Sequence, residues 1–409
     1  MMRWPGGRLP VRAGAAFGRR AWPTLALAWA LCGAPTAAAP AVVRVGLVGR
    51  FPSPSALVVE ASAGAKLRDA DGAVLARGPA AWRFAAHRGE VEARDGDRDV
   101  GRRTWLRVEP GQAPLAVALP GSASRAYRGA LEVRAEPRRG GPRLLLVNEA
   151  PLEEYLRGVI ALEMAAEAPR EALLAQCVLA RTYAVRGRRG GGRPYDLTDT
   201  TSSQVYGGVA AETDLTDSAL RATAGMALLR YGEPVGAGYF DDCGGITAVG
   251  AGDGDWPPSV VDRPEPGGRD FCAAGRYHTW QLMLTPGELG DRLAGAGRAR
   301  IGTVREVTVS EFDASGRARR VRVAGEMGVE EMAGAAFRAA LGYARLRSTL
   351  FVVSRGEGGA FVFDGRGNGH GRGMCQQGAR GMAAVGRTCV QILEHYFPGA
   401  ILAPLPERG

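Results

Sequence analysis

Apolar and polar positions along the chain predict strands in its first third and a mixture of helices and strands afterwards. Residues 42–48, 56–60 and 115–119 are short runs rich in Val, Leu and Ala, which is typical of strands. Asp71-Gly72 and Asp95-Gly96 mark tight turns between such runs. We therefore expect residues 40–122 to form a small β-rich domain.

Helical spacing appears further along the chain. After Pro151, the positions Tyr155, Leu156, Val159 and Ile160 recur as one helical face, and a second helix is expected to begin near Pro169. Hairpin strands at 127–133 and 144–147 precede these helices. Strands at 304–312 and 317–323, a helix at about 329–341 and a last helix near 376–396 follow them. Helices and strands interleave without a repeating βαβ period, so we predict an α+β domain over residues 123–402.

Residues 1–39 have the features of an export signal. Five arginines and no acid surround or precede the short apolar stretch 24–32, and Ala37-Ala38-Ala39 offers a cleavage site with small residues. The apolar stretch is shorter than the roughly 20 residues that span a bilayer, and an uncleaved anchor is the alternative. We expect an exported protein of the periplasm or cell envelope, with at most a transient or N-terminal membrane association.

The formal net charge of +10 points at first to nucleic acid. Half of this excess belongs to the five arginines of residues 1–39, and no basic stripe stands out in the remainder. A mildly basic, exported chain suits an anionic cell wall, so we expect no nucleic-acid partner.

The cysteines beyond residue 39 are Cys177, Cys243, Cys272, Cys375 and Cys389. Cys243 and Cys272 enclose a loop rich in Gly and Pro and are candidates for a disulfide in an exported protein. Cys177 lies in an apolar helical stretch, where a buried thiol is expected. No Cys-x-x-Cys or Cys/His spacing indicates zinc, so we predict no metal and no cofactor.

Glu163 is the first candidate for chemistry. It follows the apolar run 159–162, where partial burial would raise the pKa of a carboxyl and suit it to act as a general acid near neutral pH. A solvent-exposed glutamate at a helix end is the alternative interpretation.

Two further segments stand out by composition. Residues 365–374 alternate glycine with other residues around His370, which lets backbone approach a ligand closely. Residues 196–208 are dense in hydroxyl and amide groups and reach Tyr206; this suits hydrogen bonding to sugars and equally suits an ordinary turn-rich loop.

In combination these motifs resemble the SpoIID/LytB family, which comprises stage II sporulation protein D and the amidase enhancers. The resemblance runs in the family's order over about two thirds of the chain. Its main motifs are Asn148–Met164, Glu171–Gln176, Ala180–Ala184, Thr200-Thr201, Gln204-Val205-Tyr206, Tyr239-Phe240, Cys243-Gly244-Gly245, Gly365–Met374 with Gln376, and Ile392–Gly399.

The resemblance implies a lytic transglycosylase that cleaves peptidoglycan glycan strands lacking stem peptides, with Glu163 as the single catalytic acid/base. It also implies that a set of residues lines the substrate groove: Arg181, Gln204, Tyr206, Tyr239, His370 and Gln376. A non-catalytic amidase enhancer, which binds wall glycan or a cell-wall amidase, is the alternative function.

Two departures from the family's pattern stand out. Ser202 and Ser203 occupy the places of a zinc-binding His and Cys found in some members, which again predicts no zinc. Gln377 replaces a tryptophan that would stack on sugar.

Overall fold

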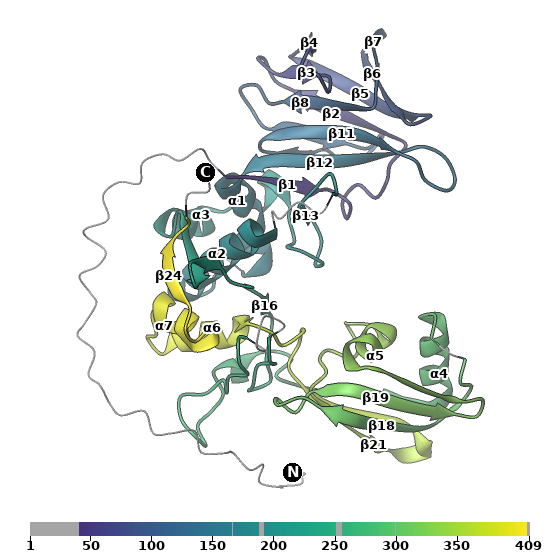
Figure 1. The fold of residues 1–409 in the computed structure, drawn as a ribbon, viewed down its shortest axis with the longest axis vertical. Coiled ribbons are helices and arrows are strands. Elements are labelled where there is room, and N and C mark those ends of the chain that lie inside the picture. Colours follow the sequence, from purple (N-terminus) through teal and green to yellow (C-terminus); the bar gives the residue numbers. More distant parts are fainter. Residues whose placement is uncertain (1–40, 166, 188–191, 251–255, 299, 407–409) are drawn as a thin grey trace. The chain divides into compact units, whose positions relative to one another are not determined.

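The computed structural model describes residues 41–165, 167–187, 192–250, 256–298 and 300–406 (Figure 1). The expected export signal, residues 1–39, lies outside these ranges. Among the described helices, none combines the length and apolar character needed to cross a membrane. In the part of the chain that the structure describes, strands alone precede residue 152, and helices and strands alternate after it, which confirms the α+β class.

Two antiparallel sheets occupy the N-terminal part. Their strands are β1 (Val42–Gly46), β2 (Ala56–Ala61), β3 (Lys66–Arg68), β4 (Val74–Arg77), β5 (Ala80–His87), β6 (Glu90–Asp95), β7 (Arg98–Arg103), β8 (Trp105–Glu109), β9 (Leu115–Ala118), β10 (Arg125–Tyr127), β11 (Ala130–Glu136) and β12 (Arg143–Pro151), joined by β13 (Leu197–Thr198) in parallel with β1. One sheet has the order β13-β1-β12-β11-β8-β3-β4 and the other β10-β9-β2-β5-β6-β7.

The alternation of side chains along these strands explains why the sheets pack on each other. Trp82 and Phe84 of β5, with Val91 and Ala93 of β6, alternate with more exposed neighbours and lie in the core. Pairing continues across residue 122, where we expected a domain boundary, because β11 pairs with β8 and β12 pairs with β1.

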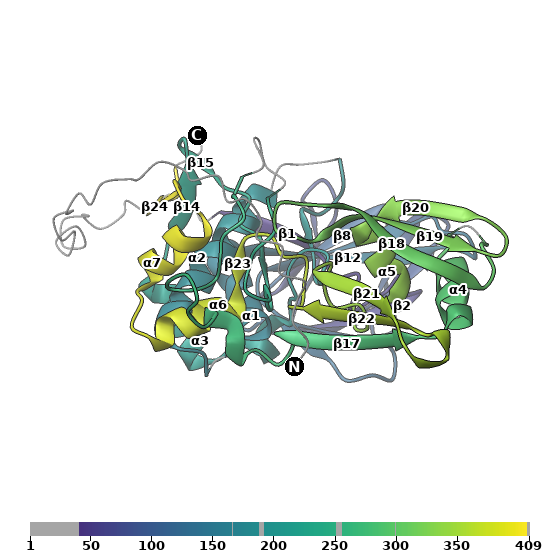
Figure 2. The ribbon, with the colours of Figure 1, turned by 90° about the horizontal axis from the view of Figure 1, so that it is seen from below.

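A group of helices follows the strands (Figure 2). It comprises α1 (Leu152–Glu163), α2 (Arg170–Gly187), α3 (Asp214–Ala222), α6 (Gln376–Ala384) and α7 (Cys389–Tyr396), together with the sheet β15-β14-β24 (Glu233–Pro234, Met226–Arg230, Ile401–Pro404). Helix α2 contacts the other four helices and β14, so it is buried on nearly every side. A helix with apolar contacts all round forms the centre of such a layer.

A second hydrophobic core lies within residues 284–363. Its elements are β17 (Thr279–Leu284), α4 (Pro286–Gly295), β18 (Val304–Phe312), β19 (Ala318–Gly325), β20 (Val329–Ala333), α5 (Gly334–Leu341), β21 (Phe351–Arg355) and β22 (Phe361–Arg366). The strands expected at 304–312 and 317–323 are present as β18 and β19, which pair with each other.

The helix expected over 329–341 is partly wrong, because residues 329–333 pair with β19 as β20. Helix α5 begins at Gly334, where any side chain would clash with the carbonyl oxygen of Ala318. The single last helix is also wrong: α6 and α7 are separate, and Gly386 between them has a left-handed φ of 82°. The remaining elements are short: β16 (Tyr239–Phe240) pairs in parallel with β23 (Met374–Cys375), and the single turns are η1 (Gly208–Ala211), η2 (Phe271–Ala274) and η3 (Glu357–Gly359).

Candidate functional site

Glu163 is the last residue of α1, and its side chain is half-buried. Its Oε1 accepts a hydrogen bond of 2.7 Å from the backbone N–H of Val205. Burial raises the pKa of the Glu163 carboxyl, and the Val205 hydrogen bond opposes that shift. The partial negative charge at a helix C-terminus further disfavours the ionised form. Glu163 therefore has the environment of a carboxyl that holds its proton to a higher pH than an exposed one.

Gln376 fixes the backbone beside this carboxyl. Its Nε2 donates to the carbonyl oxygen of Glu163 over 2.8 Å and to Gln176 Oε1 over 3.3 Å. Because Gln376 is the first residue of α6, this contact couples the end of α1 to the start of α6. The structure thus brings Gln376 to Glu163, as a residue that positions the backbone.

Gln204 lies in a buried hydrogen-bond network. Its Nε2 donates to the Tyr239 hydroxyl over 2.9 Å, and its Oε1 accepts from the Tyr155 hydroxyl over 3.2 Å. Burial raises the pKa of both tyrosine hydroxyls, and the nearby charge of Glu163 adds to the rise. Gln204 itself has no exposed surface, so its contribution is to hold the hydroxyl groups of Tyr155 and Tyr239 by hydrogen bonds.

Two of the residues expected to contact substrate lie in the core. Arg181 is fully buried, and its Nε and Nη2 donate to the Glu153 carboxylate over 2.7 and 2.8 Å. Tyr206 is 5% exposed and donates its hydroxyl proton to Asn148 Oδ1 over 2.8 Å. Arg181 is enclosed by Glu153 of α1 and by the backbone of Leu220 and Met226. Tyr206 packs against the rings of Tyr127 and Tyr155. Both side chains therefore lie inside the protein rather than at a surface that a glycan could contact.

His370 lies exposed at the wall of a cleft. Its Nδ1 accepts from the backbone N–H of Arg372 over 3.1 Å, so its Nε2 carries the proton and donates to the Tyr239 carbonyl over 3.1 Å. The surrounding protein atoms restrict hydration of the imidazole and, with the charge of Arg372, lower the pKa of His370 to about 4. The ring is therefore neutral at physiological pH.

The cleft has a volume of about 920 Å³, which suits several sugar rings. Tyr183 and Ser203 lie in its wall. Glu163 is not itself among the lining residues, but its charge contributes to the raised pKa of Tyr183. Ser203 lies two residues before Val205, whose N–H binds Glu163 Oε1, so this wall of the cleft is close to Glu163.

An aromatic and cationic group lines the same cleft, and sequence reasoning missed it. The guanidinium carbon of Arg230 lies 4.7 Å from the ring centre of Tyr231 and 4.9 Å from that of Trp256. Tyr231 is 89% exposed. Two aromatic rings and a guanidinium gathered in one cleft form a candidate binding surface. In the sequence, Pro234 and Pro257 indicate loops near Tyr231 and Trp256. The sequence does not indicate that these two rings lie in the same cleft, because they are 25 positions apart and only the fold brings them together.

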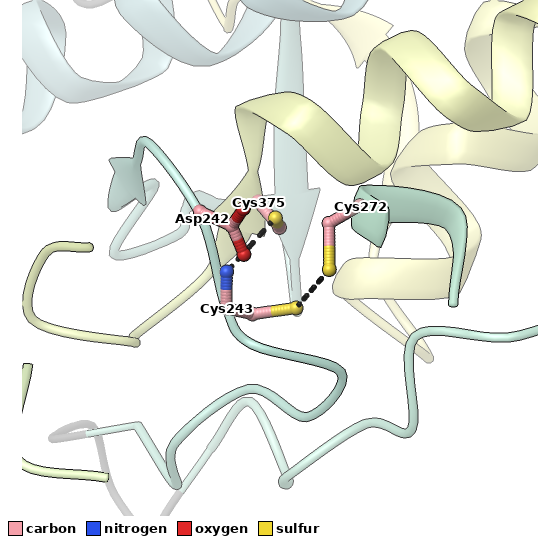
Figure 3. Close-up of side chains that lie close together, drawn as sticks. All are labelled: Asp242, Cys243, Cys272 and Cys375. Atoms are coloured by element: carbon pink, nitrogen blue, oxygen red, sulfur yellow. Dashed lines mark hydrogen bonds between the residues drawn. The ribbon is translucent and has the colours of Figure 1, made fainter. Parts of the chain in front are cut away.

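A separate buried cluster contains the candidate disulfide (Figure 3). The Sγ atoms of Cys243 and Cys272 are 3.4 Å apart, and neither cysteine forms a disulfide in this structure. Asp242 and Cys375 complete the cluster, whose possible ligand atoms all lie within 4.8 Å of one another. Among the described residues, this group is the one with the composition to hold a metal ion.

Comparison with known proteins identifies two matching family models. One, described as stage II sporulation protein, matches residues 141–230, which include α1 and α2. The other, described as a domain of unknown function, matches residues 270–373 and includes the second hydrophobic core. The first match contains Glu163.

Several curated proteins are similar over most of the described chain. An uncharacterized protein of Brachyspira hyodysenteriae is 30% identical over 262 residues, covering 63% of this chain and 67% of that protein. Stage II sporulation protein D of Bacillus amyloliquefaciens is 30% identical over 272 residues, covering 62% and 74%. The amidase enhancer of Bacillus subtilis is 28% identical over 290 residues, covering 60% and 40%.

Proposed function

This chain belongs to the SpoIID family of stage II sporulation proteins, and we propose that it is an exported peptidoglycan lytic transglycosylase with Glu163 as its acid/base. A cell-wall function is the broader conclusion that the family and the amidase-enhancer relative support. The substrate would be glycan strands that lack stem peptides, met in the periplasm or cell envelope.

The reaction needs one carboxyl used twice. Glu163 would protonate the bridging O4 of the leaving sugar as the glycosidic bond breaks. The resulting carboxylate would then accept the proton of the muramic acid's C6 hydroxyl as that oxygen bonds to C1. The products are a free O4 hydroxyl and a 1,6-anhydro ring, and Glu163 regains its proton.

The single observation that carries this proposal is the setting of Glu163. Hydrolytic glycosidases place two carboxyl groups across the bond, and each influences the other. The pKa of Glu163 is raised by burial rather than by a second carboxylate. Oε1 is held by Val205, and no carboxylate of the described residues contributes to the shift, so this half-buried carboxyl suits chemistry in which the substrate supplies its own nucleophile.

The cleft supports binding of such a strand. Tyr231 and Trp256 offer faces on which sugar rings can stack. Arg186, Arg230 and Arg372 also line it. A muramic acid without its stem peptide carries a free lactyl carboxylate, which these guanidinium groups could bind as hydrogen-bonded ion pairs.

The decisive experiment incubates the purified chain with stem-peptide-free glycan and analyses the products by mass spectrometry. We expect anhydromuramyl ends with the wild type and a loss of at least about 100-fold in rate with Glu163→Gln, the range of general acid/base catalysis. Glu167→Gln is the matched control, because Glu167 is exposed and four residues away. Equal rates for wild type and Glu163→Gln would contradict the catalytic role.

The second candidate, a non-catalytic amidase enhancer, is favoured by one observation: Glu163 does not line the cleft directly. An enhancer would bind glycan without cleaving it and raise the rate at which a cell-wall amidase releases stem peptides. Two results together would establish this function instead: the wild type and Glu163→Gln stimulate a cell-wall amidase equally, and neither forms an anhydromuramyl product.

A further inference from the structure

Four buried side chains from three separate segments meet in one place (Figure 3). Asp242 and Cys243 follow β16, Cys272 lies in η2, and Cys375 ends β23 directly before α6. Each is at most 1% exposed. Their donor atoms, three sulfurs and a carboxylate oxygen, all lie within 4.8 Å of one another.

The spacing of the sulfurs suits a shared metal ion. Tetrahedral zinc binds each thiolate at about 2.3 Å, which puts neighbouring sulfurs about 3.8 Å apart. A disulfide needs about 2.05 Å. The observed Cys243–Cys272 distance of 3.4 Å is much closer to the first value.

The carboxylate of Asp242 has an unused oxygen. Oδ1 accepts a hydrogen bond of 2.8 Å from the backbone N–H of Gly244. Oδ2 is buried and has no hydrogen-bond partner among the described residues. A buried carboxylate oxygen without a partner is costly, and a cation bound to it removes that cost.

A buried positive charge lies next to the cluster. Arg317 is 3% exposed and donates through Nη2 to the carbonyl oxygen of Cys243 over 2.9 Å. Within the described ranges no carboxylate lies at ion-pairing distance from its guanidinium. Three thiolates and a carboxylate around Zn²⁺ carry a net charge of −2, which Arg317 would partly neutralise. Two backbone N–H groups, of Cys243 and Gly378, also point to Cys375 Sγ at 3.1 and 3.3 Å, as donors to a thiolate do.

We propose that Asp242, Cys243, Cys272 and Cys375 form a structural zinc site. Binding of Zn²⁺ would release the protons of the three thiols to solvent, and four protein ligands leave no open position for substrate. The ion would join the β16 loop, η2 and the start of α6. Because Gln376 follows Cys375 and holds the Glu163 carbonyl, the site would set the position of α6 against α1.

The proposed zinc site departs from the sequence-based expectation of no metal, which rested on the lack of short Cys or Cys/His spacing and on Ser202 and Ser203. The four residues come from distant segments and lie outside residues 200–204. It also competes with the disulfide expected between Cys243 and Cys272, because those sulfurs would be zinc ligands.

The test measures metal content and oxidation state on the same preparation. The chain is expressed with zinc in the medium, purified without reductant and analysed by elemental and intact-mass spectrometry. We expect one zinc per chain and no mass deficit from a disulfide. Cys375→Ser and Asp242→Asn should weaken zinc affinity about tenfold or more, whereas Cys389→Ser, a buried cysteine outside the cluster, should retain the metal.

A second measurement does not depend on the variants folding. Wild-type chain freed of metal with a chelator is titrated with Co²⁺, and thiolate-to-metal charge-transfer absorption is recorded together with the visible bands of tetrahedral cobalt. Saturation at one Co²⁺ per chain, reversed by Zn²⁺, is the expected result. A Cys243–Cys272 disulfide in the purified chain, failure to bind either zinc or cobalt, or a zinc affinity in Cys375→Ser equal to that of the wild type would overturn the proposal.

Discussion

The substitution Glu153→Gln tests whether the ion pair between Arg181 and Glu153 stabilises the packing of the helices. Glu153→Gln keeps the size of the side chain and one acceptor oxygen but removes the negative charge. Arg181 has no exposed surface, so its guanidinium would remain buried without its counter-charge. The same substitution leaves every cleft-lining residue in place.

The magnitude follows from what Arg181 loses and keeps. Removing one partner of a fully buried ion pair costs about 3–5 kcal/mol. The Glu153 side chain is 44% exposed, so water screens part of this attraction. Arg181 also keeps its hydrogen bond of 3.1 Å to the Met226 carbonyl. We therefore expect the free energy of unfolding to fall by about 2 kcal/mol, near the loss of one hydrogen bond to a charged group.

Urea unfolding followed by tryptophan fluorescence checks this value. Glu153→Gln should unfold at lower urea than the wild type, whereas Glu167→Gln, at an exposed position, should stay within about 0.5 kcal/mol. Below the unfolding transition, the glycan affinity of Glu153→Gln should match that of the wild type. Unchanged stability together with weakened glycan binding would refute the reasoning and place Arg181 in the substrate groove.

Three further substitutions test the site. Because burial raises the pKa of Glu163, its ionised form destabilises the fold, and Glu163→Gln should be more stable than the wild type at pH 7. Denaturation at several pH values should show this advantage vanishing below about pH 4.5, where Glu163 is protonated in both the folded and the unfolded state. Tyr206→Phe removes the hydrogen bond to Asn148 and should lower the free energy of unfolding by about 1 kcal/mol without changing the rate of glycan cleavage; a large rate loss would mean that Tyr206 contacts substrate. Tyr231→Ala should weaken glycan binding about tenfold in calorimetry, equivalent to about 1.4 kcal/mol, and leave stability unchanged because the ring is 89% exposed; unchanged binding would exclude stacking there.

Local sequence was sufficient wherever one element carries the signal. The 3.6-residue spacing of Tyr155, Leu156, Val159 and Ile160 predicted α1. The apolar run before Glu163 indicated a partly buried carboxyl, and the structure shows that α1 ends at this residue. The pattern of residues 304–312 and 317–323 likewise predicted the strands β18 and β19. Each of these features depends on neighbours within a few positions along the chain.

Periodicity failed where an element is buried on all sides. Helix α2 has no polar face, so nothing in its spacing tells whether Arg181 points to solvent or to the core. The answer depends on Glu153, which lies 28 residues earlier in the chain. Tyr183, two residues after Arg181, lines the cleft instead.

The α+β class, the helix that contains Tyr155 to Ile160 and the family resemblance could be predicted from the sequence, because each rests on residue patterns within short segments. Tertiary structure alone decided which of the predicted groove residues reach the cleft and which support it from the core. It also brought Cys243, Cys272 and Cys375 together with Asp242, although no short metal-binding spacing links them. Burial and long-range contacts create these arrangements, and neither is encoded in local spacing.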